Sequence, residues 1–315
     1  MNYVLITGAN GFIGRHLARS LASKGYQVSG IGHGSWSEQD AAIWGVRNWL
    51  NGDINLSNLR QLQLSCALPD VVYHLAGGSS VSVAISNPHD DFYRTVVGTA
   101  ELLEWLRVDA PMARLVAVSS AAVYGSGHEG PILENAKLAP YSPYGHHKRV
   151  MEELCQSYAA SYGLRVCIAR LFSVFGVELK KQLLWDLCTR LAANERPIML
   201  GGSGNELRDW TDVRDVVRAL DLLAAQANAD MPVFNVGTGI SFSVRDIAAR
   251  ITSLWPLPDA ARAIIFSGHS RPGDPFSLVA NPERLNKLQF SWTVSVDDGL
   301  LDYVRWFKVK VRSTQ

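Results

Sequence analysis

Residues 3–14 read Tyr-Val-Leu-Ile-Thr-Gly-Ala-Asn-Gly-Phe-Ile-Gly, and this stretch decides the fold of the chain. It begins with an apolar run typical of a buried strand, and apolar side chains then recur at helical spacing from Ile13 to Leu21. The stretch predicts a strand, a glycine-rich turn and a helix. Glycines let backbone N–H groups approach a diphosphate at the positive end of that helix. A dinucleotide is the expected ligand, and a purely structural turn is the alternative.

The rest of the chain repeats the alternation of apolar runs and helical patterns. Further strands are expected at 26–31, 47–50, 69–78, 115–118 and 164–171. This order predicts an α/β protein with a Rossmann-type, doubly wound parallel sheet over residues 1–171. Residues 172–315 are expected to form mostly a smaller C-terminal α/β substrate lobe, from which a segment at about 209–240 returns to the first domain.

The end of the second strand bears on the choice of cofactor. A carboxylate there usually accepts hydrogen bonds from the adenosine ribose of NAD. This chain has Gly32-His33-Gly34-Ser35 instead, so NADP(H) is favoured and NAD(H) remains possible. His33 and Ser35 are the candidate donors to a 2′-phosphate. Asp53, after the third strand, is expected either to accept from the adenine amino group or to cap the next helix.

A Tyr-x-x-x-Lys pair carries the expected chemistry. Ser142 and Pro143 predict a helix start, and the helix should end at Gly163. Tyr144 and Lys148 then share one helix face. A nearby cation lowers the pKa of a phenol, which suits the pair to proton transfer at an alcohol. Ser120, at the end of a buried strand, could bind the same oxygen, or it could simply cap a local turn.

Composition excludes several other classes of protein. Hydrophobic residues make up 47% and charged residues 19% of the 315 residues, and the net charge is +1, which argues against nucleic acid as a partner. The four cysteines lack metal-binding spacing and are expected to be reduced core thiols, and no metal is expected. No apolar run approaches the roughly 20 residues that span a membrane. The N-terminus enters a strand directly, so a cytoplasmic protein is expected.

These motifs together resemble the extended short-chain dehydrogenases/reductases, and more narrowly the nucleotide-sugar epimerases, dehydratases and reductases. The resemblance covers nearly the whole chain. It is carried by residues 7–14, 52–54, 74–77, 98–99, 119–125, 142–148, 208–210 and 271–274.

The resemblance implies a role for each matching residue. Tyr144 would be the acid and base at the sugar oxygen, Lys148 would lower its pKa and hold the nicotinamide ribose, and Ser120 would orient the reacting oxygen. Further cofactor contacts are implied for Gly8, Asn10, Gly11, Phe12, Ile13, Gly14, Asp53, Ile54, Leu75, Ala76, Gly77 and Leu171. Contacts to a nucleotide-diphosphate sugar are implied for Ser79, Ser120, Ser173, Arg208, Arg271 and Asp274. His74 is expected to be a core histidine.

Departures from the family pattern narrow the reaction. The 4,6-dehydratases carry carboxylates directly after the strand-end Ser or Thr, and the 3,5-epimerizing reductases carry a Cys there. This chain has Ala121 and Ala122, so neither reaction has its acid or base. Thr95 and Ser173 stand where the family usually has Asn. Gly32 and a match of 208–215 to the GDP-6-deoxymannose reductase branch favour a 4-keto-6-deoxyhexose reductase.

Two alternatives to the reductase stay open. One is a UDP-hexose 4-epimerase that keeps NAD tightly bound. The other is a protein that senses NAD(P) without catalysis, whose usual mark is loss of the catalytic Tyr or Lys. The expected helices at 90–107 and 144–162 carry apolar residues on more than one side, as in relatives that pair them across a two-fold axis, so a homodimer is expected.

Overall fold

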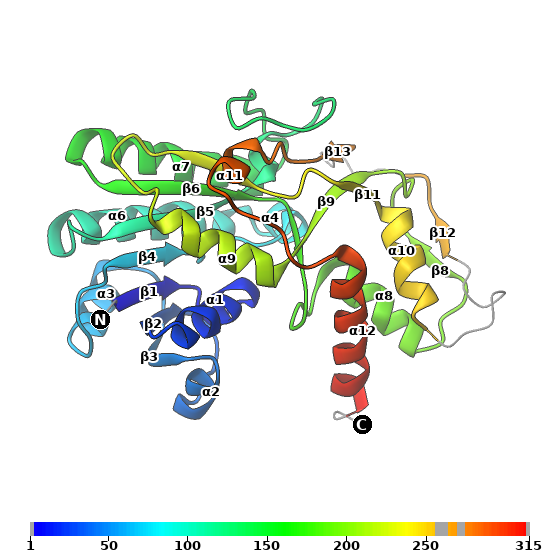
Figure 1. The fold of residues 1–315 in the computed structure, drawn as a ribbon, viewed down its shortest axis with the longest axis horizontal. Coiled ribbons are helices and arrows are strands. Elements are labelled where there is room, and N and C mark those ends of the chain that lie inside the picture. Colours follow the sequence, from blue (N-terminus) through cyan, green and yellow to red (C-terminus); the bar gives the residue numbers. More distant parts are fainter. Residues whose placement is uncertain (1–2, 256–263, 270–274, 313–315) are drawn as a thin grey trace. The chain divides into compact units, whose positions relative to one another are not determined.

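The computed structural model describes residues 3–255, 264–269 and 275–312 (Figure 1). The chain divides into two compact units. The first comprises Met1–Gly125, Glu134–Leu171 and Val217–Val236, and the second comprises Ser126–Leu133, Phe172–Val216 and Gly237–Gln315. Among the described helices, none combines the length and the apolar character needed to cross a membrane.

A parallel sheet forms the centre of the first unit. In the described chain it has seven strands in the order β10-β6-β5-β4-β1-β2-β3 (Figure 1). All neighbouring strands run parallel. Their bounds are β1 (Tyr3–Thr7), β2 (Gln27–Gly32), β3 (Val46–Asn51), β4 (Val71–His74), β5 (Arg114–Ser120), β6 (Arg165–Leu171) and β10 (Val233–Val236).

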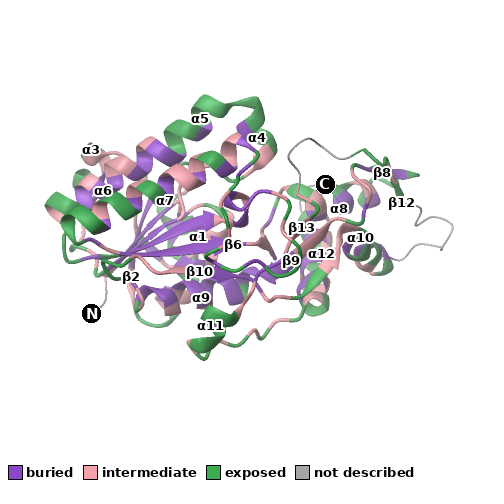
Figure 2. Ribbon diagram, turned by 90° about the horizontal axis from the view of Figure 1, so that it is seen from above, coloured by how far each residue is buried: buried purple, intermediate pink, exposed green. Residues whose placement is uncertain are grey.

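Helices cover both faces of this sheet (Figure 2). One face packs against α3 (Leu56–Gln63), α6 (Gly98–Asp109) and α7 (Pro143–Tyr162), and the other against α1 (Phe12–Ser23) and α9 (Val213–Ala224). Leu59, Trp105 and Met151 come from the first three helices and join the buried cluster over the strands. The remaining elements of this unit are α2 (Glu38–Ile43), α4 (Val81–Ser86), α5 (Pro88–Phe92), a π-helical turn (Tyr93–Val97) and a 3₁₀ turn (Ala121–Val123).

Strand order reverses between β1 and β4, because the chain leaves β1 toward β2 and β3 and then returns to the other side for β4, β5 and β6. At such a switch point the loops at the carboxyl ends of two neighbouring strands diverge and leave room for a ligand. The glycine-rich turn after β1 and the loop after β4 meet this description. The predicted doubly wound α/β fold is confirmed.

Local sequence explains why α7 begins and ends where predicted. The side chain of Ser142 accepts a hydrogen bond from the Gly145 N–H at 3.2 Å, and Pro143 occupies the first helical turn. Gly163 ends the helix in the left-handed conformation, with φ of 70°. The expected helix at 90–107 is instead divided into α5, the π-helical turn and α6, a division that a simple periodicity does not reveal.

The second unit is built from short strands and helices. β9 (Leu207–Asp212) pairs with β7 (Ser173–Phe175), β11 (Ser241–Ser243) and β13 (Ser277–Leu278), and β8 (Ile198–Leu200) pairs with β12 (Ile264–Phe266). Its helices are α8 (Gln182–Ala192), α10 (Val244–Ser253), α11 (Glu283–Lys287) and α12 (Val296–Arg312). The buried carboxylate of Asp209 ties this unit together by accepting from Thr238, Gly239 and Ala280.

Candidate active site

The glycine-rich turn after β1 has the shape of a cradle for a diphosphate. Gly8 has φ of +74°, and a Cβ added there would lie 2.9 Å from the backbone N of Ala76. A Cβ on Gly14 would lie 2.2 Å from the carbonyl oxygen of Gly8. The N-cap of α1 is Gly11, which has no side chain to cap the helix, and the first turn of α1 holds no acidic residue. These features fit a dinucleotide whose diphosphate accepts from the α1 N-terminus.

The adenosine end of the expected cofactor site contains a hydrogen-bonded pair that the sequence did not indicate. His33 Nε2 lies 2.9 Å from Asp53 Oδ1, and both side chains are about half exposed. Ser35, two residues after His33, is exposed to solvent. Ile54 lies against Gly98, because a Cβ added to Gly98 would lie 3.6 Å from Ile54 Cβ. His33 is thus paired with a carboxylate at the position where it was expected to donate to a 2′-phosphate.

The loop after β4 is fixed by threonine and histidine side chains. His74 is fully buried, and its ring nitrogens lie 2.7 Å from Thr7 Oγ1 and 2.9 Å from Thr99 Oγ1. Burial, assisted by the positive charge of Lys148, lowers the pKa of His74 to about 3, so the ring is neutral near pH 7. The expected core histidine is confirmed. Thr7 Oγ1 also accepts from the Ala76 N–H at 3.2 Å, which holds the loop against β1.

Ser120, Tyr144 and Lys148 meet at the carboxyl end of β5. Tyr144 lies beside Ser120, whose side chain acts to lower the pKa of the phenol, and Ser120 Oγ also accepts from the Ala122 N–H at 3.2 Å. Lys148 is 3% exposed, and its ammonium donates to the Val118 carbonyl oxygen at 3.0 Å. A Cβ added to Gly77 would lie 3.6 Å from Lys148 Nζ, so the loop after β4 passes beside the ammonium. The structure therefore brings together the three residues to which the sequence assigned the chemistry.

The pKa shifts of this pair differ from the simple expectation that Lys148 lowers the pKa of Tyr144. Burial raises the pKa of Tyr144, its hydrogen bond with Ser120 lowers it, and the negative charge of Asp91 raises it. Burial also lowers the pKa of Lys148 to about 8, against the raising effects of the Asp91 and Glu152 carboxylates. Lys148 thus stays mostly protonated at pH 7.

Other expected cofactor residues also lie at or just after the carboxyl ends of the parallel strands. Leu171 ends β6 in register with Ser120, and the Leu75 N–H donates to the Thr7 carbonyl oxygen at 3.1 Å. Asn10, in the glycine-rich turn, accepts from Arg15 through both its backbone and side-chain oxygens. Ser79, an expected substrate contact, is exposed in the loop after β4.

The expected substrate residues of the second unit are described only in part. Ser173 begins β7, opposite Trp210 of β9. Arg208 lies on β9, and its guanidinium donates to the carbonyl oxygens of Leu207 at 2.8 Å and Phe276 at 3.3 Å. Arg271 and Asp274 lie outside the described residues.

Sequence reasoning missed Asp91, which acts on both Tyr144 and Lys148, and gave Thr95 only as a departure from the family pattern. Asp91 is 4% exposed and lies 2.6 Å from His147 Nδ1. Thr95 Oγ1 accepts from the Gly78 N–H at 2.8 Å, from within the π-helical turn. Adjacent acids such as Asp90 and Asp91 are favoured near a helix N-terminus by its dipole, so no sequence pattern singles out Asp91.

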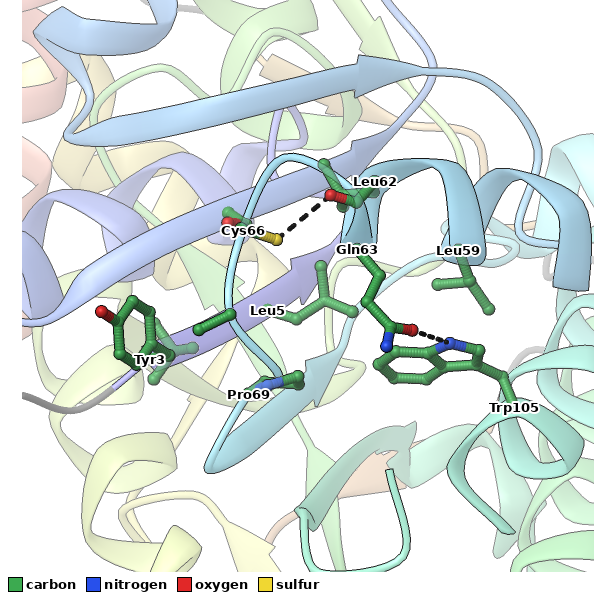
Figure 3. A pocket seen from close by; sticks show the side chains of 11 residues that line it. Tyr3, Leu5, Leu59, Leu62, Gln63, Cys66, Pro69 and Trp105 are labelled. Carbon is green, nitrogen blue, oxygen red and sulfur yellow. Dashed lines mark hydrogen bonds between the residues drawn. The ribbon is translucent and has the colours of Figure 1, made fainter. Parts of the chain in front are cut away.

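A small hollow lies at the opposite end of the strands. It is bounded by the start of β1, the end of α3 and the side chain of Trp105 (Figure 3). Trp105 Nε1 donates to Gln63 Oε1 at 3.3 Å across its wall. Tyr3 begins β1 and Pro69 precedes β4, so this hollow is at the amino ends of the parallel strands, away from Tyr144 and the glycine-rich turn.

Fold and site together define an extended short-chain dehydrogenase/reductase. The model of the NAD dependent epimerase/dehydratase family matches residues 4–237, so the chain belongs to this family. It is 29% identical to a UDP-glucose 4-epimerase of Azospirillum brasilense over 318 residues, which cover 95% of this chain and 89% of that protein.

Solved structures of similar proteins extend the likeness over 98% of the chain. A UDP-glucuronic acid 4-epimerase of Bacillus cereus, in complex with UDP-glucuronic acid and NAD, is 27% identical over 99% of its length with a TM-score of 0.86. MoeE5 in complex with UDP-glucose and NAD is 30% identical over its whole length with a TM-score of 0.87. These likenesses support the 4-epimerase alternative better than the 4-keto-6-deoxyhexose reductase, and they give no sign of a preference for NADP.

Proposed function

We propose that this protein is an NAD-dependent 4-epimerase of a UDP-hexose. The observation that carries the proposal is the grouping of Ser120, Tyr144 and the buried Lys148 at the carboxyl end of β5, with alanines at positions 121 and 122. That arrangement provides a proton carrier at one sugar oxygen and no carboxylate for elimination. Similarity to UDP-glucose 4-epimerases supports the same reaction.

NAD, when bound, would supply reversible hydride chemistry at C4 of the sugar. Tyr144, as a phenolate, would take the proton of the C4 hydroxyl, and the phenol so formed would return it to the same oxygen after the sugar has presented its other face. Ser120 would hold that oxygen through a hydrogen bond and keep the phenol aligned. The phenol exchanges one proton in each direction, so the pair ends each cycle in its starting state.

The protonation of the pair sets the conditions for this cycle. The pKa of Tyr144 lies above its ordinary value because the phenol is buried, so the phenol is protonated near pH 7. A protonated phenol suits the return of the proton to the sugar oxygen. The phenolate that takes the C4 hydroxyl proton needs positive charge nearby, and the ammonium of Lys148, one turn further along α7 and charged below a pKa of about 8, is the proposed source.

NAD is the proposed cofactor in place of the NADP(H) favoured by the sequence. The similar structures contain NAD, and His33 is paired with Asp53. A 2′-phosphate beside that pair would meet the Asp53 carboxylate, and repulsion between like charges opposes its binding. An epimerase returns its cofactor to the starting oxidation state in each cycle, so NAD can stay bound.

The nucleotide sugar is assigned mostly to residues 172–315 and the cofactor mostly to residues 1–171. Arg208 and Arg271 are the proposed partners of the substrate diphosphate, because a guanidinium binds phosphate oxygens in a bidentate manner. Ser79, Ser173 and Asp274 are the proposed polar contacts to the rest of the substrate.

A homodimer is also proposed. Val83, Ile85, Phe92 and Tyr93 expose 56%, 56%, 42% and 48% of their surface along α4, α5 and the π-helical turn. Apolar side chains gathered on neighbouring elements favour association, and most soluble oligomers are two-fold symmetric. Light scattering at micromolar concentration tests this, and a monomeric mass would reject it.

The reaction is tested by incubating the purified protein with UDP-galactose and measuring UDP-glucose, without added cofactor. We expect interconversion, NAD released on denaturation, and a loss of at least about 100-fold in Tyr144→Phe. Tyr141→Phe is the matched control, because Tyr141 is 63% exposed three residues away. Consumption of NADPH with a 4-keto-6-deoxy nucleotide sugar, without UDP-hexose interconversion, would restore the reductase interpretation.

A further inference from the structure

A buried pair of an acid and an imidazole lies beside the Tyr144–Lys148 pair and has no role in the proposed reaction. Asp91 Oδ2 and His147 Nδ1 are 2.6 Å apart, with side chains 4% and 15% exposed. His147 immediately precedes Lys148 on α7, whereas Asp91 comes from α5. Phe92 packs its ring edge-on against His147, with ring centroids 5.4 Å apart. Both partners are therefore held by neighbouring helices.

The Asp91 carboxylate also packs against the loop after β4, which passes beside the Lys148 ammonium. A Cβ added to Gly78 would lie 1.7 Å from Asp91 Oδ1, so only glycine fits between the carboxylate and this loop. The neighbouring Gly77 has its would-be Cβ 3.6 Å from Lys148 Nζ. Thr95, in the π-helical turn that follows α5, accepts from the Gly78 N–H at 2.8 Å. The carboxylate is thus fixed close to the loop next to Lys148.

The charge of Asp91 reaches both members of the catalytic pair. It acts to raise the pKa of Lys148 and the pKa of Tyr144. Other titratable groups act on Lys148 too. Glu152 and Cys155, on the same helix, also act to raise its pKa, and His74 of β4 lies within reach of its field but stays neutral near pH 7. Asp91 is the acid among them that acts on both the phenol and the ammonium.

We propose that Asp91, held by His147, is a positioning residue whose carboxylate keeps Lys148 charged and acts on the ionisation of Tyr144. The inference rests on the proposed function of that pair. Asp91 offsets part of the cost of burying an ammonium, so the cation persists at pH values where burial alone would remove its proton. His147 prevents the carboxylate from turning toward solvent.

The sign of the effect follows from the charge. Removing the negative charge with Asp91→Asn removes an influence that raises the pKa of Lys148, so the ammonium loses its proton at lower pH. The alkaline limb of the epimerase pH profile should then move down by at least about half a pH unit. Asp91→Glu keeps the charge and should restore most of the profile. A side chain that served only to pack would change the amplitude and leave the limb in place.

Asp91 and His147 each have a neighbour in sequence that serves as a matched control. Asp90 is exposed and paired with Arg94, so Asp90→Asn removes an equal charge without touching the site. His146 is exposed, whereas His147 is largely buried. We expect His147→Phe to shift the alkaline limb in the same direction as Asp91→Asn, and His146→Phe and Asp90→Asn to leave it unchanged.

A second readout separates this inference from the proposed function, because it needs no substrate. Ultraviolet difference titration of each protein against the same protein carrying Tyr144→Phe reports ionisation of Tyr144 alone. We expect that ionisation at lower pH in Asp91→Asn than in Asp90→Asn. Absence of UDP-hexose interconversion together with this shift would reject the reaction and keep the inference. Coincident titrations of the two Asn variants would overturn the inference. If Asp91→Asn fails to fold, coincident titrations of His147→Phe and His146→Phe would overturn it equally.

Discussion

The ion pair between Glu152 and Arg170 offers a sharp test of how the first unit is held together. Glu152 Oε1 accepts from Arg170 Nε at 3.0 Å, and Oε2 accepts from Arg170 Nη2 at 2.7 Å. The side chains are only 6% and 5% exposed. Arg170 also donates to the Tyr124 hydroxyl and to the Glu134 carbonyl oxygen, both at 2.9 Å. The pair therefore joins α7 to β6 within a buried polar network.

The magnitude follows from the charge that Glu152→Gln would leave uncompensated. Breaking a buried pair by neutralising one partner costs about 3–5 kcal/mol, because the remaining charge stays buried. Arg170 would keep two acceptors, the Tyr124 hydroxyl and the Glu134 carbonyl oxygen, and would gain the carbonyl oxygen of the new glutamine. The expected loss of unfolding free energy therefore lies near the lower end of this range, at about 3 kcal/mol. The adjacent Glu153 pairs with Arg149 with both side chains about half exposed, so Glu153→Gln should cost no more than about 0.5 kcal/mol.

Urea denaturation followed by far-ultraviolet circular dichroism measures both variants under identical conditions. Neighbouring glutamates on one helix give equal changes in composition and helix propensity, so the difference reports burial and pairing. A free energy of unfolding for Glu152→Gln within 1 kcal/mol of that for Glu153→Gln would refute the reasoning, since it would mean that Arg170 finds equivalent compensation without the carboxylate.

Three further predictions concern the site. The pKa of His74 is lowered to about 3 in the folded protein, so its contribution to stability is complete above the unfolded value of about 6.5 and is lost as the pH falls toward 3. His74→Gln should therefore flatten the acid limb of a curve of unfolding free energy against pH, and an unchanged slope would contradict this. Lys148→Met should abolish epimerisation yet raise the unfolding free energy at pH 7 by about 1–2 kcal/mol. Removal of a buried ammonium whose pKa is lowered to about 8 stabilises the fold, and loss of the donor to the Val118 carbonyl oxygen offsets part of that gain. Denaturation curves that show equal or lower stability would count against this prediction. Gly14→Ala should lower NAD retention at least about 10-fold, because its Cβ would lie 2.2 Å from the Gly8 carbonyl oxygen. Mass spectrometry of the cofactor that copurifies measures this retention, and full retention would show that the turn does not bind the diphosphate.

The fold was predictable because its signals are local. A buried parallel strand is a short apolar run, and the helix that follows repeats every 3.6 residues, so alternation of the two patterns predicts the sheet. The start and end of α7 follow from Ser142, Pro143 and Gly163, whose preferences act within a few bonds. The division of 90–107 was not predictable from periodicity, and within its π-helical turn Thr95 accepts from the Gly78 N–H of the loop after β4, a contact that apolar spacing does not indicate.

The choice of reaction and cofactor depended on weaker signals. The absence of a carboxylate at the end of β2 favoured NADP(H), but Asp53 of the neighbouring loop supplies one there by pairing with His33. That pair joins residues 20 positions apart. Likewise, the match of 208–215 to a reductase branch was outweighed by the 4-epimerases to which nearly the whole chain is similar.

The sequence by itself determined the glycine-rich turn, the parallel sheet and the identities of Ser120, Tyr144 and Lys148, because residue type and spacing specify those features directly. Tertiary structure alone decided the electrostatics of the pair. Burial, which no spacing reveals, raises the pKa of Tyr144 and lowers that of Lys148 to about 8. Asp91 joins them only because α5 packs beside α7, 56 residues away from its partner His147.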